Sequence, residues 1–163
     1  MPTNPTKSSN KCTNKFSNKY VIYTDGSCRP NPGQGTWAYC ILKDNKKIYE
    51  SSGYVKRTTN NRMELFSIIN SLRFMYHLVR PFSHIPAEIE IYTDSLLVSK
   101  YNQYGRGRKN RDLVDELVAL NAIMKPSYQW IRGHSGIEWN EYVDRLCDQA
   151  YALSKDRSYM HSS

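Results

Sequence analysis

Four acidic side chains have the residue type and positions along the chain that a shared metal site would need. Asp25 and Asp94 each end an apolar, β-branched run that predicts a strand. Glu64 and Asp144 lie in stretches with helical periodicity. Each acid alone has a structural interpretation, as a turn cap, a helix-terminus acid or part of a solvated face. Carboxylates that meet at one sheet edge repel one another unless cations neutralise them, so the pattern also favours a metal site.

Oxygen ligands of this kind suit hard divalent cations such as Mg²⁺ or Mn²⁺. Two such ions about 3.5–4 Å apart can activate a water on one side of a phosphate and stabilise the leaving oxygen on the other. That chemistry needs no protein nucleophile, and the sequence shows no serine or cysteine triad context. Metal-dependent phosphodiester hydrolysis is therefore the chemistry that these residue types favour.

The four acids belong to four short motifs that follow one another along the chain. The motifs are Tyr23-Thr-Asp25-Gly-Ser27, Thr59-Asn-Asn-Arg-Met-Glu64-Leu, Tyr92-Thr-Asp94-Ser95, and Gly133-His134-Ser-Gly136 followed by Asn140 and Asp144. With these motifs, residues 20–151 closely resemble ribonuclease H of type 1. The resemblance implies a ribonuclease H-like α/β fold. It also implies an endoribonuclease that hydrolyses the RNA strand of RNA–DNA hybrids, such as primers and R-loops, leaving 5′-phosphate and 3′-hydroxyl ends.

The same resemblance implies a role for each catalytic residue around two Mg²⁺ ions, with Mn²⁺ as a possible substitute and no small-molecule cofactor. Asp25 bridges both ions, while Glu64 and Asp94 complete the site of the ion nearer the attacking water. Asp144 holds the other ion. His134, which as an arbitrary histidine would be a surface residue, assists proton transfer or product departure.

An enzyme that cuts only RNA must sense the 2′-hydroxyl, which is accessible in the wide minor groove of an A-like duplex. Asn31, Asn60 and Asn61 match family positions that touch this groove, and Cys28 and Ser95 lie beside them. The structural alternatives are a turn residue between two prolines for Asn31 and a helix cap for Asn60.

Three further residues, Arg57, Thr59 and Asn110, match a family pocket that grips a phosphate of the DNA strand. The alternative for Asn110 is an N-cap of the following helix. The 15 residues between Asp94 and Asn110 replace a longer, tryptophan-bearing protrusion of many cellular members with a short basic loop. This loop carries Tyr101, Tyr104, Arg106, Arg108, Lys109 and Arg111.

The short loop keeps two alternatives to a stand-alone enzyme open. One is a ribonuclease H domain that acts with a reverse transcriptase or another partner that supplies hybrid binding. The other is a module that binds hybrids without chemistry, which the presence of all four acids disfavours.

Strand and helix signals predict an α/β fold with element order βββαβαβα and a five-stranded mixed sheet flanked by helices. Helices are expected from Thr59 or Asn60 to Pro81, briefly after Asp94, from Asn110 or Asp112 onward, and at the end of the chain. Strands are expected at residues 20–25, 35–42, 46–54, 88–93 and 127–131. Trp37 and Trp130 fall in predicted strands and are expected in the core.

The net charge of +8 comes largely from the ends of the chain. Residues 1–19 carry lysines and no acid and are expected to be a flexible basic arm, and residues 154–163 a loose tail. Residues 20–153 are expected to form the catalytic domain. No run approaches the ~18 apolar residues of a membrane span, and the four cysteines form no C-x-x-C pair, so we expect a reduced, cytoplasmic protein. Nothing in the composition suggests a symmetric interface, so a monomer is the expectation.

Overall fold

The computed structural model describes residues 18–82, 84–96 and 109–160, with side chains as far as Asp156. The predicted element order is confirmed, with a short 3-10 helix after the first α-helix. The elements are β1 (Lys19–Cys28), β2 (Gly33–Lys43), β3 (Lys46–Thr58), α1 (Asn60–Val79), η1 (Arg80–Phe82), β4 (Glu88–Thr93), α3 (Arg111–Met124), β5 (Ser127–Trp130) and α4 (Glu138–Met160).

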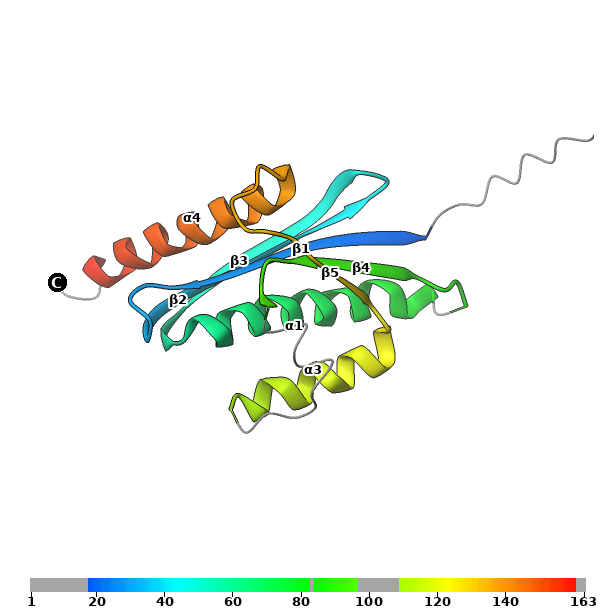
Figure 1. Cartoon of the computed structure of the whole chain (residues 1–163), viewed down its shortest axis with the longest axis horizontal. Helices are drawn as coiled ribbons and strands as arrows, with labels where there is room; N and C mark the ends of the chain where they lie inside the picture. The colour runs from blue at the N-terminus through cyan, green and yellow to red at the C-terminus, as the bar shows by residue number, and fades with distance from the viewer. Residues whose placement is uncertain (1–17, 83, 97–108, 161–163) are drawn as a thin grey trace, which may run out of the picture.

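The five strands form one mixed sheet in the order β3-β2-β1-β4-β5. The pairs β1–β2 and β2–β3 are antiparallel, whereas β1–β4 and β4–β5 are parallel. Figure 1 shows α1 and α3 on one face of the sheet and α4 on the other. The central strand β1 therefore touches helices on both faces.

The alternation of side chains along β2 builds a separate apolar layer on each face. Tyr39 and Ile41 join a cluster that includes α1 and α3, whereas Cys40 packs with Val143 and Cys147 of α4. Because successive strand residues point to opposite faces, one buried strand supports both layers. This two-sided burial fixes β1 and β2 as the rigid platform of the molecule.

Helix α1 begins where the sequence predicts, with Thr59 as its N-cap. The Thr59 hydroxyl accepts a hydrogen bond from the Arg62 backbone N–H at 3.4 Å, which satisfies a donor of the first helical turn. The helix ends before Pro81, which lies in η1. Of the two predicted caps, Thr59 is correct and Asn60 is the first helical residue.

The C-terminal prediction is wrong in part, because α4 continues to Met160 where a loose tail was expected from Ser154. Ser154 is 4% exposed, and its hydroxyl donates to the Tyr151 carbonyl and also contacts the Gln34 amide. The buried Ser154 side chain packs against Gln34 of β2, and this contact holds the end of α4 in helical form. Of the arm expected at residues 1–19, residues 1–17 lie outside the described residues, whereas Lys19 is the first residue of β1. The predicted helix after Asp94 also lies outside the described residues, apart from the start at Leu96.

Two further sequence expectations need correction. Asp25 does not end its strand, since β1 continues to Cys28 through pairing with β2 alone. Trp130 is not a core residue, because β5 is an edge strand and the indole is 50% exposed. None of the helices in the described part of the chain has the length and apolar character needed to cross a membrane.

Candidate active site

The site forms where the parallel strands β1 and β4 part. Their pairing ends at Tyr23 and Tyr92, two residues before Asp25 and Asp94 respectively. Ligands commonly bind beyond the carboxyl ends of parallel strands, where neighbouring connections diverge. The two aspartates therefore lie at the opening of a cavity, and the sequence prediction that they meet at one sheet edge agrees with this geometry.

Gly26 lets α1 approach the strand at the position next to Asp25. A Cβ atom at Gly26 would lie 2.3 Å from the Met63 carbonyl carbon and 2.4 Å from the Glu64 nitrogen. Only glycine allows this backbone-to-backbone contact between β1 and α1. The contact brings the first turns of α1, and with them Glu64, to the same end of the sheet as Asp25.

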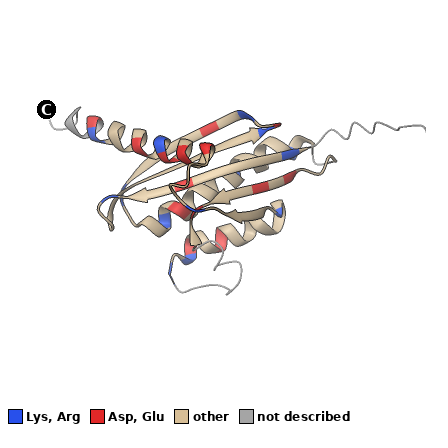
Figure 2. Cartoon of the chain, turned by 45° about the horizontal axis from the view of Figure 1, so that its top comes forward, with Lys and Arg blue, Asp and Glu red and all other residues tan. Residues whose placement is uncertain are grey.

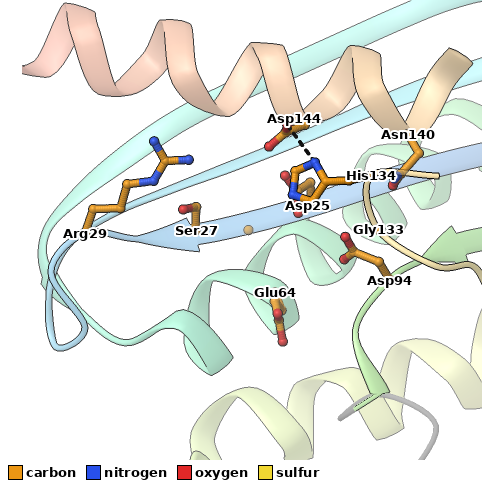
Figure 3. A pocket seen from close by; sticks show the side chains of 10 residues that line it. Asp25, Ser27, Arg29, Glu64, Asp94, Gly133, His134, Asn140 and Asp144 are labelled. Carbon is orange, nitrogen blue, oxygen red and sulfur yellow. Dashed lines mark ion pairs between the residues drawn. The ribbon is translucent and has the colours of Figure 1, made fainter. Parts of the chain in front are cut away.

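Two side-chain donors hold the Glu64 carboxylate. The Asn60 amide donates to Oε1 at 2.9 Å, and the Ser95 hydroxyl donates to Oε2 at 2.7 Å. The second contact links α1 to the segment that follows β4. Both oxygens are thereby oriented, which leaves the carboxylate with little rotational freedom at the cavity wall (Figure 3).

The loop between β5 and α4 brings His134 over the cavity. Its imidazole Nδ1 lies 3.9 Å from Asp144 Oδ2, and its side chain is 83% exposed. Gly133 passes so close to Asp94 that a Cβ atom there would lie 2.7 Å from the carboxylate Oδ2. The loop therefore lies close to both Asp94 and Asp144.

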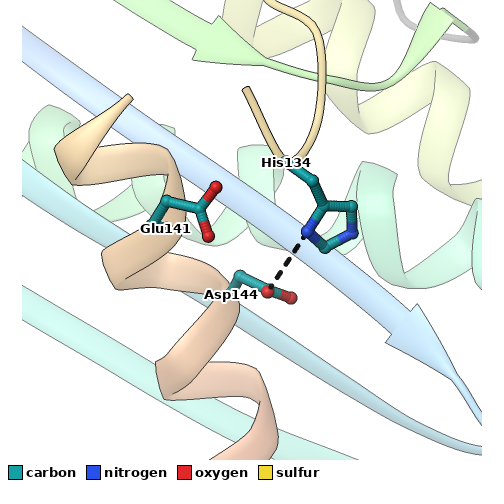
Figure 4. Close-up of side chains that lie close together, drawn as sticks. All are labelled: His134, Glu141 and Asp144. Carbon is teal, nitrogen blue, oxygen red and sulfur yellow. Dashed lines mark ion pairs between the residues drawn. The ribbon is translucent and has the colours of Figure 1, made fainter. Parts of the chain in front are cut away.

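Glu141 is a nearby acid that the sequence analysis did not identify. Its Oε1 accepts a hydrogen bond from the Gly136 backbone N–H at 3.4 Å, and ligand atoms of Glu141, His134 and Asp144 all lie within 4.8 Å of one another (Figure 4). The available sequence signal was its position one helical turn before Asp144, which places both residues on one face of α4.

All five predicted catalytic residues line one cavity of about 390 Å³. Figure 3 shows the carboxylates converging from β1, α1, α4 and the segment after β4. The cavity is lined by Asp25, Gly26, Ser27, Arg29, Glu64, Asp94, Gly133, His134, Asn140 and Asp144. Four sequence segments that lie far apart in the chain thus contribute one acid each.

The electrostatics of the cavity disfavour four anions together. Burial, followed by the charges on Asp94 and Asp144, raises the pKa of Asp25 to about 8. Burial also raises the pKa of Glu64 and of Asp94, the former against hydrogen bonds from Ser95 and Asn60. Carboxylates that line one cavity and whose charges oppose one another are suitable oxygen ligands for hard divalent cations. The residues present therefore fit a site for a divalent cation.

The predicted minor-groove residues divide into two groups. Asn31 and Asn60 meet, because the Asn31 side-chain oxygen accepts the Asn60 backbone N–H at 3.1 Å, and Asn61 is exposed beside them. Cys28 and Ser95 are buried instead. The Cys28 thiol lies 3.2 Å and 3.3 Å from the carbonyls of Pro30 and Thr58, so its side chain secures the β1–β2 turn.

Arg62, a residue for which sequence reasoning assigned no role, contacts Thr59 and Asn110, two of the three residues expected to grip a phosphate. Its guanidinium makes two hydrogen bonds to the Asp112 carboxylate, at 2.9 and 2.7 Å, and lies 3.5 Å from the Asn110 amide oxygen. Asn110 stands at the N-cap position of α3, as the structural alternative expected, but its backbone is left-handed with φ 57° and its side chain makes no capping hydrogen bond. Arg57 is exposed near the end of β3.

Comparison with known families and sequences gives a consistent result. The sequence model of the RNase H family matches residues 17–152. Ribonuclease H of Treponema denticola is 37% identical over 151 residues, covering 79% of this chain and 94% of that protein. Ribonuclease HI of Campylobacter jejuni is 39% identical over 138 residues, covering 79% of this chain and 88% of that protein.

Solved structures share the fold at lower sequence identity. The N-terminal RNase H domain of a Mycobacterium tuberculosis protein superposes with a TM-score of 0.71 at 24% identity, covering 86% of this chain and 98% of that one. A compost-derived enzyme, LC11-RNase H1, was solved in complex with an RNA/DNA hybrid. It superposes with a TM-score of 0.68 at 22% identity, covering 81% of this chain and 99% of that one.

Proposed function

Because the chain belongs to the ribonuclease H family, we propose that its acidic cavity hydrolyses the RNA strand of RNA–DNA hybrids. The observation that carries the proposal is the convergence of Asp25, Glu64, Asp94 and Asp144 in one cavity. The activity is endonucleolytic and leaves 5′-phosphate and 3′-hydroxyl ends. RNA primers and R-loops are substrates of this class.

The four carboxylates would hold two Mg²⁺ ions, with Mn²⁺ as a substitute. Asp25 is the most enclosed of the four and has the acids of three other segments around it, which supports a bridging role. The Asn60 and Ser95 contacts fix Glu64 in one orientation for ligation. Bound ions of this kind lower the pKa of an attacking water and stabilise negative charge on the leaving oxygen.

His134 is the proton-carrying side chain of the site. Its imidazole is exposed, lies in a loop between two glycines and is 3.9 Å from Asp144 through Nδ1. The geometry leaves Nε2 available to hold or release a proton at the cavity entrance, where the leaving 3′ oxygen or the departing product needs one. The exposure of the His134 side chain at the cavity therefore supports a role in proton transfer or product departure.

Hybrid recognition uses two surfaces beside the cavity. Asn60, which donates its backbone N–H to the Asn31 side chain, also donates a side-chain hydrogen bond to Glu64. This pair of asparagines is therefore placed to contact 2′-hydroxyls close to the cleaved bond. Asn61 extends the same edge, while Cys28 and Ser95 contribute through backbone groups and through the orientation of their neighbours. Around Arg62, the residues Thr59 and Asn110, with Arg57 nearby in sequence, form the grip on a DNA-strand phosphate.

Cleavage of one labelled hybrid tests the proposal. The wild-type chain is incubated with Mg²⁺ or Mn²⁺, next to an Asp25→Asn variant and to double-stranded RNA, double-stranded DNA and single-stranded RNA. We expect cuts only in the RNA strand of the hybrid, and only with wild-type protein. An intact hybrid after hours with either metal and folded protein would refute the proposed activity. Cleavage that survives Asp25→Asn would refute the proposed metal site.

A further inference from the structure

Arg29 lines the acidic cavity and was not singled out by any motif. It directly follows β1, and its backbone N–H donates to the Gln34 carbonyl at 2.8 Å, which fixes the start of the β1–β2 turn. Its guanidinium Nη2 lies 3.1 Å from Asp148 Oδ1 on α4. Figure 3 shows Arg29 at one end of the cavity, with the guanidinium turned toward α4.

The stability of the fold does not depend on the charge of Arg29. The side chains of Arg29 and Asp148 are 58% and 54% exposed, and an ion pair at that exposure contributes little to stability. Among the residues that line the described cavity, Arg29 alone carries a permanent positive charge. A guanidinium at the edge of an anionic site is therefore better explained by binding of an anionic ligand than by stabilisation of the fold.

The contact with Asp148 orients the guanidinium without saturating it. That contact involves one terminal nitrogen, whereas a guanidinium has five N–H donors in a planar fork that matches a phosphate. Asp148 lies one helical turn after Asp144, so the acid that orients Arg29 and the acid of the cavity lie on the same face of α4.

We infer that Arg29 binds a non-scissile phosphate of the cut RNA strand, adjacent to the phosphate in the cavity, with Asp148 as a positioning residue. The inference rests on the proposed function for the identity of the polyanion. The RNA strand is favoured because Arg29 shares the cavity with the catalytic acids. The residues proposed to grip the DNA strand lie instead around Arg62 of α1, which contacts Asn110 and Asp112 at the start of α3.

Affinity measurements on an inactive background test this inference independently of cleavage. Labelled hybrid is titrated with Asp25→Asn protein in Mg²⁺, with and without Arg29→Gln. We expect Arg29→Gln to raise Kd about tenfold at low salt, as for the loss of one charge-assisted contact. The slope of log Kd against log salt should become shallower by about one.

Arg80→Gln is the matched control, because it removes the same charge from the far end of α1. Arg80 lies over the Tyr76 ring at 6.0 Å and does not line the cavity. Its Kd and salt slope should equal those of the parent. An Arg29→Gln variant that behaves like Arg80→Gln would overturn the inference.

Single neutral methylphosphonate linkages then locate the contact. One such linkage in the RNA strand, next to the scissile position, should weaken binding to the parent about tenfold and leave binding to Arg29→Gln unchanged. Sensitivity confined to the DNA strand would overturn the assignment of the strand. Wild-type protein that binds but never cuts the hybrid would sink the proposed function, while these affinities would still decide the role of Arg29.

Discussion

At the scale of single residues, Asp25 shows the conflict between stability and chemistry most clearly. It lies in the central strand, next to a glycine that admits α1. Burial, followed by the charges on Asp94 and Asp144, raises its pKa to about 8. An acid placed there for the fold alone would be better replaced by its amide. Its presence is explained by a cation that the folded protein must bind.

A first prediction concerns the stability of metal-free protein as pH changes. The folded-state pKa of Asp25 lies above the unfolded value, so the folded chain holds a proton that the unfolded chain loses. The associated stability is present below about pH 4 and declines as pH rises to about 8. Asp25→Asn lacks the part of this decline that Asp25 causes, and it should unfold with a free energy higher by about 1–3 kcal/mol at pH 8.

Urea unfolding of both proteins in a chelator, at pH 5 and pH 8, measures this difference. The advantage of Asp25→Asn should be larger at the higher pH. Equal free energies of unfolding at pH 8, or an advantage that shrinks with rising pH, would show that the ionised Asp25 carboxylate does not destabilise the folded protein.

A second prediction separates the role of His134 from that of the carboxylates. His134→Ala should lower kcat about 10²-fold or more, as for loss of a general acid or base, with KM and melting temperature nearly unchanged. The side chain is 83% exposed, so its removal leaves no cavity in the core. Steady-state kinetics would check this, with exposed His84→Ala as the control. An unchanged kcat would remove His134 from the chemistry.

At the scale of elements, the site depends on the approach of α1 to β1. The backbone of Met63 and Glu64 occupies the space that a side chain at position 26 would need. Glu64 is therefore placed by a contact between two main chains, and Asn60 and Ser95 then orient its carboxylate. Any side chain at this point would act on the site by separating the two elements.

Gly26→Ala tests this dependence on close approach. The added Cβ would collide with backbone that cannot rotate away, so we expect destabilisation of about 1–3 kcal/mol or more and loss of activity. Gly136→Ala is the matched control, because a Cβ there meets nothing within 4 Å and costs only its positive φ of 82°. Thermal melts should show the larger loss for Gly26→Ala. A melting temperature equal to that of wild type would contradict the packing described here.

The sequence predicted those parts of the site that local pattern encodes. Asp25 and Asp94 are recognisable because acids follow apolar strand runs, and the capping threonine marks the start of α1. Contacts between distant segments could not be read this way. Arg62 meets Asp112 at a separation of 50 residues, Arg29 after β1 meets Asp148 of α4, and neither pair leaves a periodic signal. The length of α4 and the exposure of Trp130 were missed because burial against other elements decides them.

At the scale of the whole molecule, one cavity joins four separated segments, so metal binding and folding are coupled. Cations that bind the folded chain and not the unfolded one stabilise it in proportion to the logarithm of their concentration. The mutual repulsion of the acids makes this coupling strong in the present site. Figure 2 shows several acids near the start of α4, with further acids and basic residues spread over the sheet and all the helices.

Thermal melts in Mg²⁺ and in chelator provide the corresponding prediction. At an ion concentration about 100 times Kd, the gain is about 2.7 kcal/mol per site, which for a domain of this size is roughly 5–10 °C. Asp25→Asn should lose most of this shift while melting at a higher temperature than wild type in chelator. A wild-type melting temperature that does not change with Mg²⁺ would contradict a cation site in the cavity.

The position of β3 at the edge of the sheet has a consequence for solubility. One side of its 13 residues has no neighbouring strand in the described part of the chain, and such an edge is a template for strands of other molecules. Exposed Lys46 and Lys47 lie at one end of β3, and exposed Lys56 and Arg57 at the other. A second copy adding its own β3 would bring like charges together, so these side chains protect the exposed edge against aggregation.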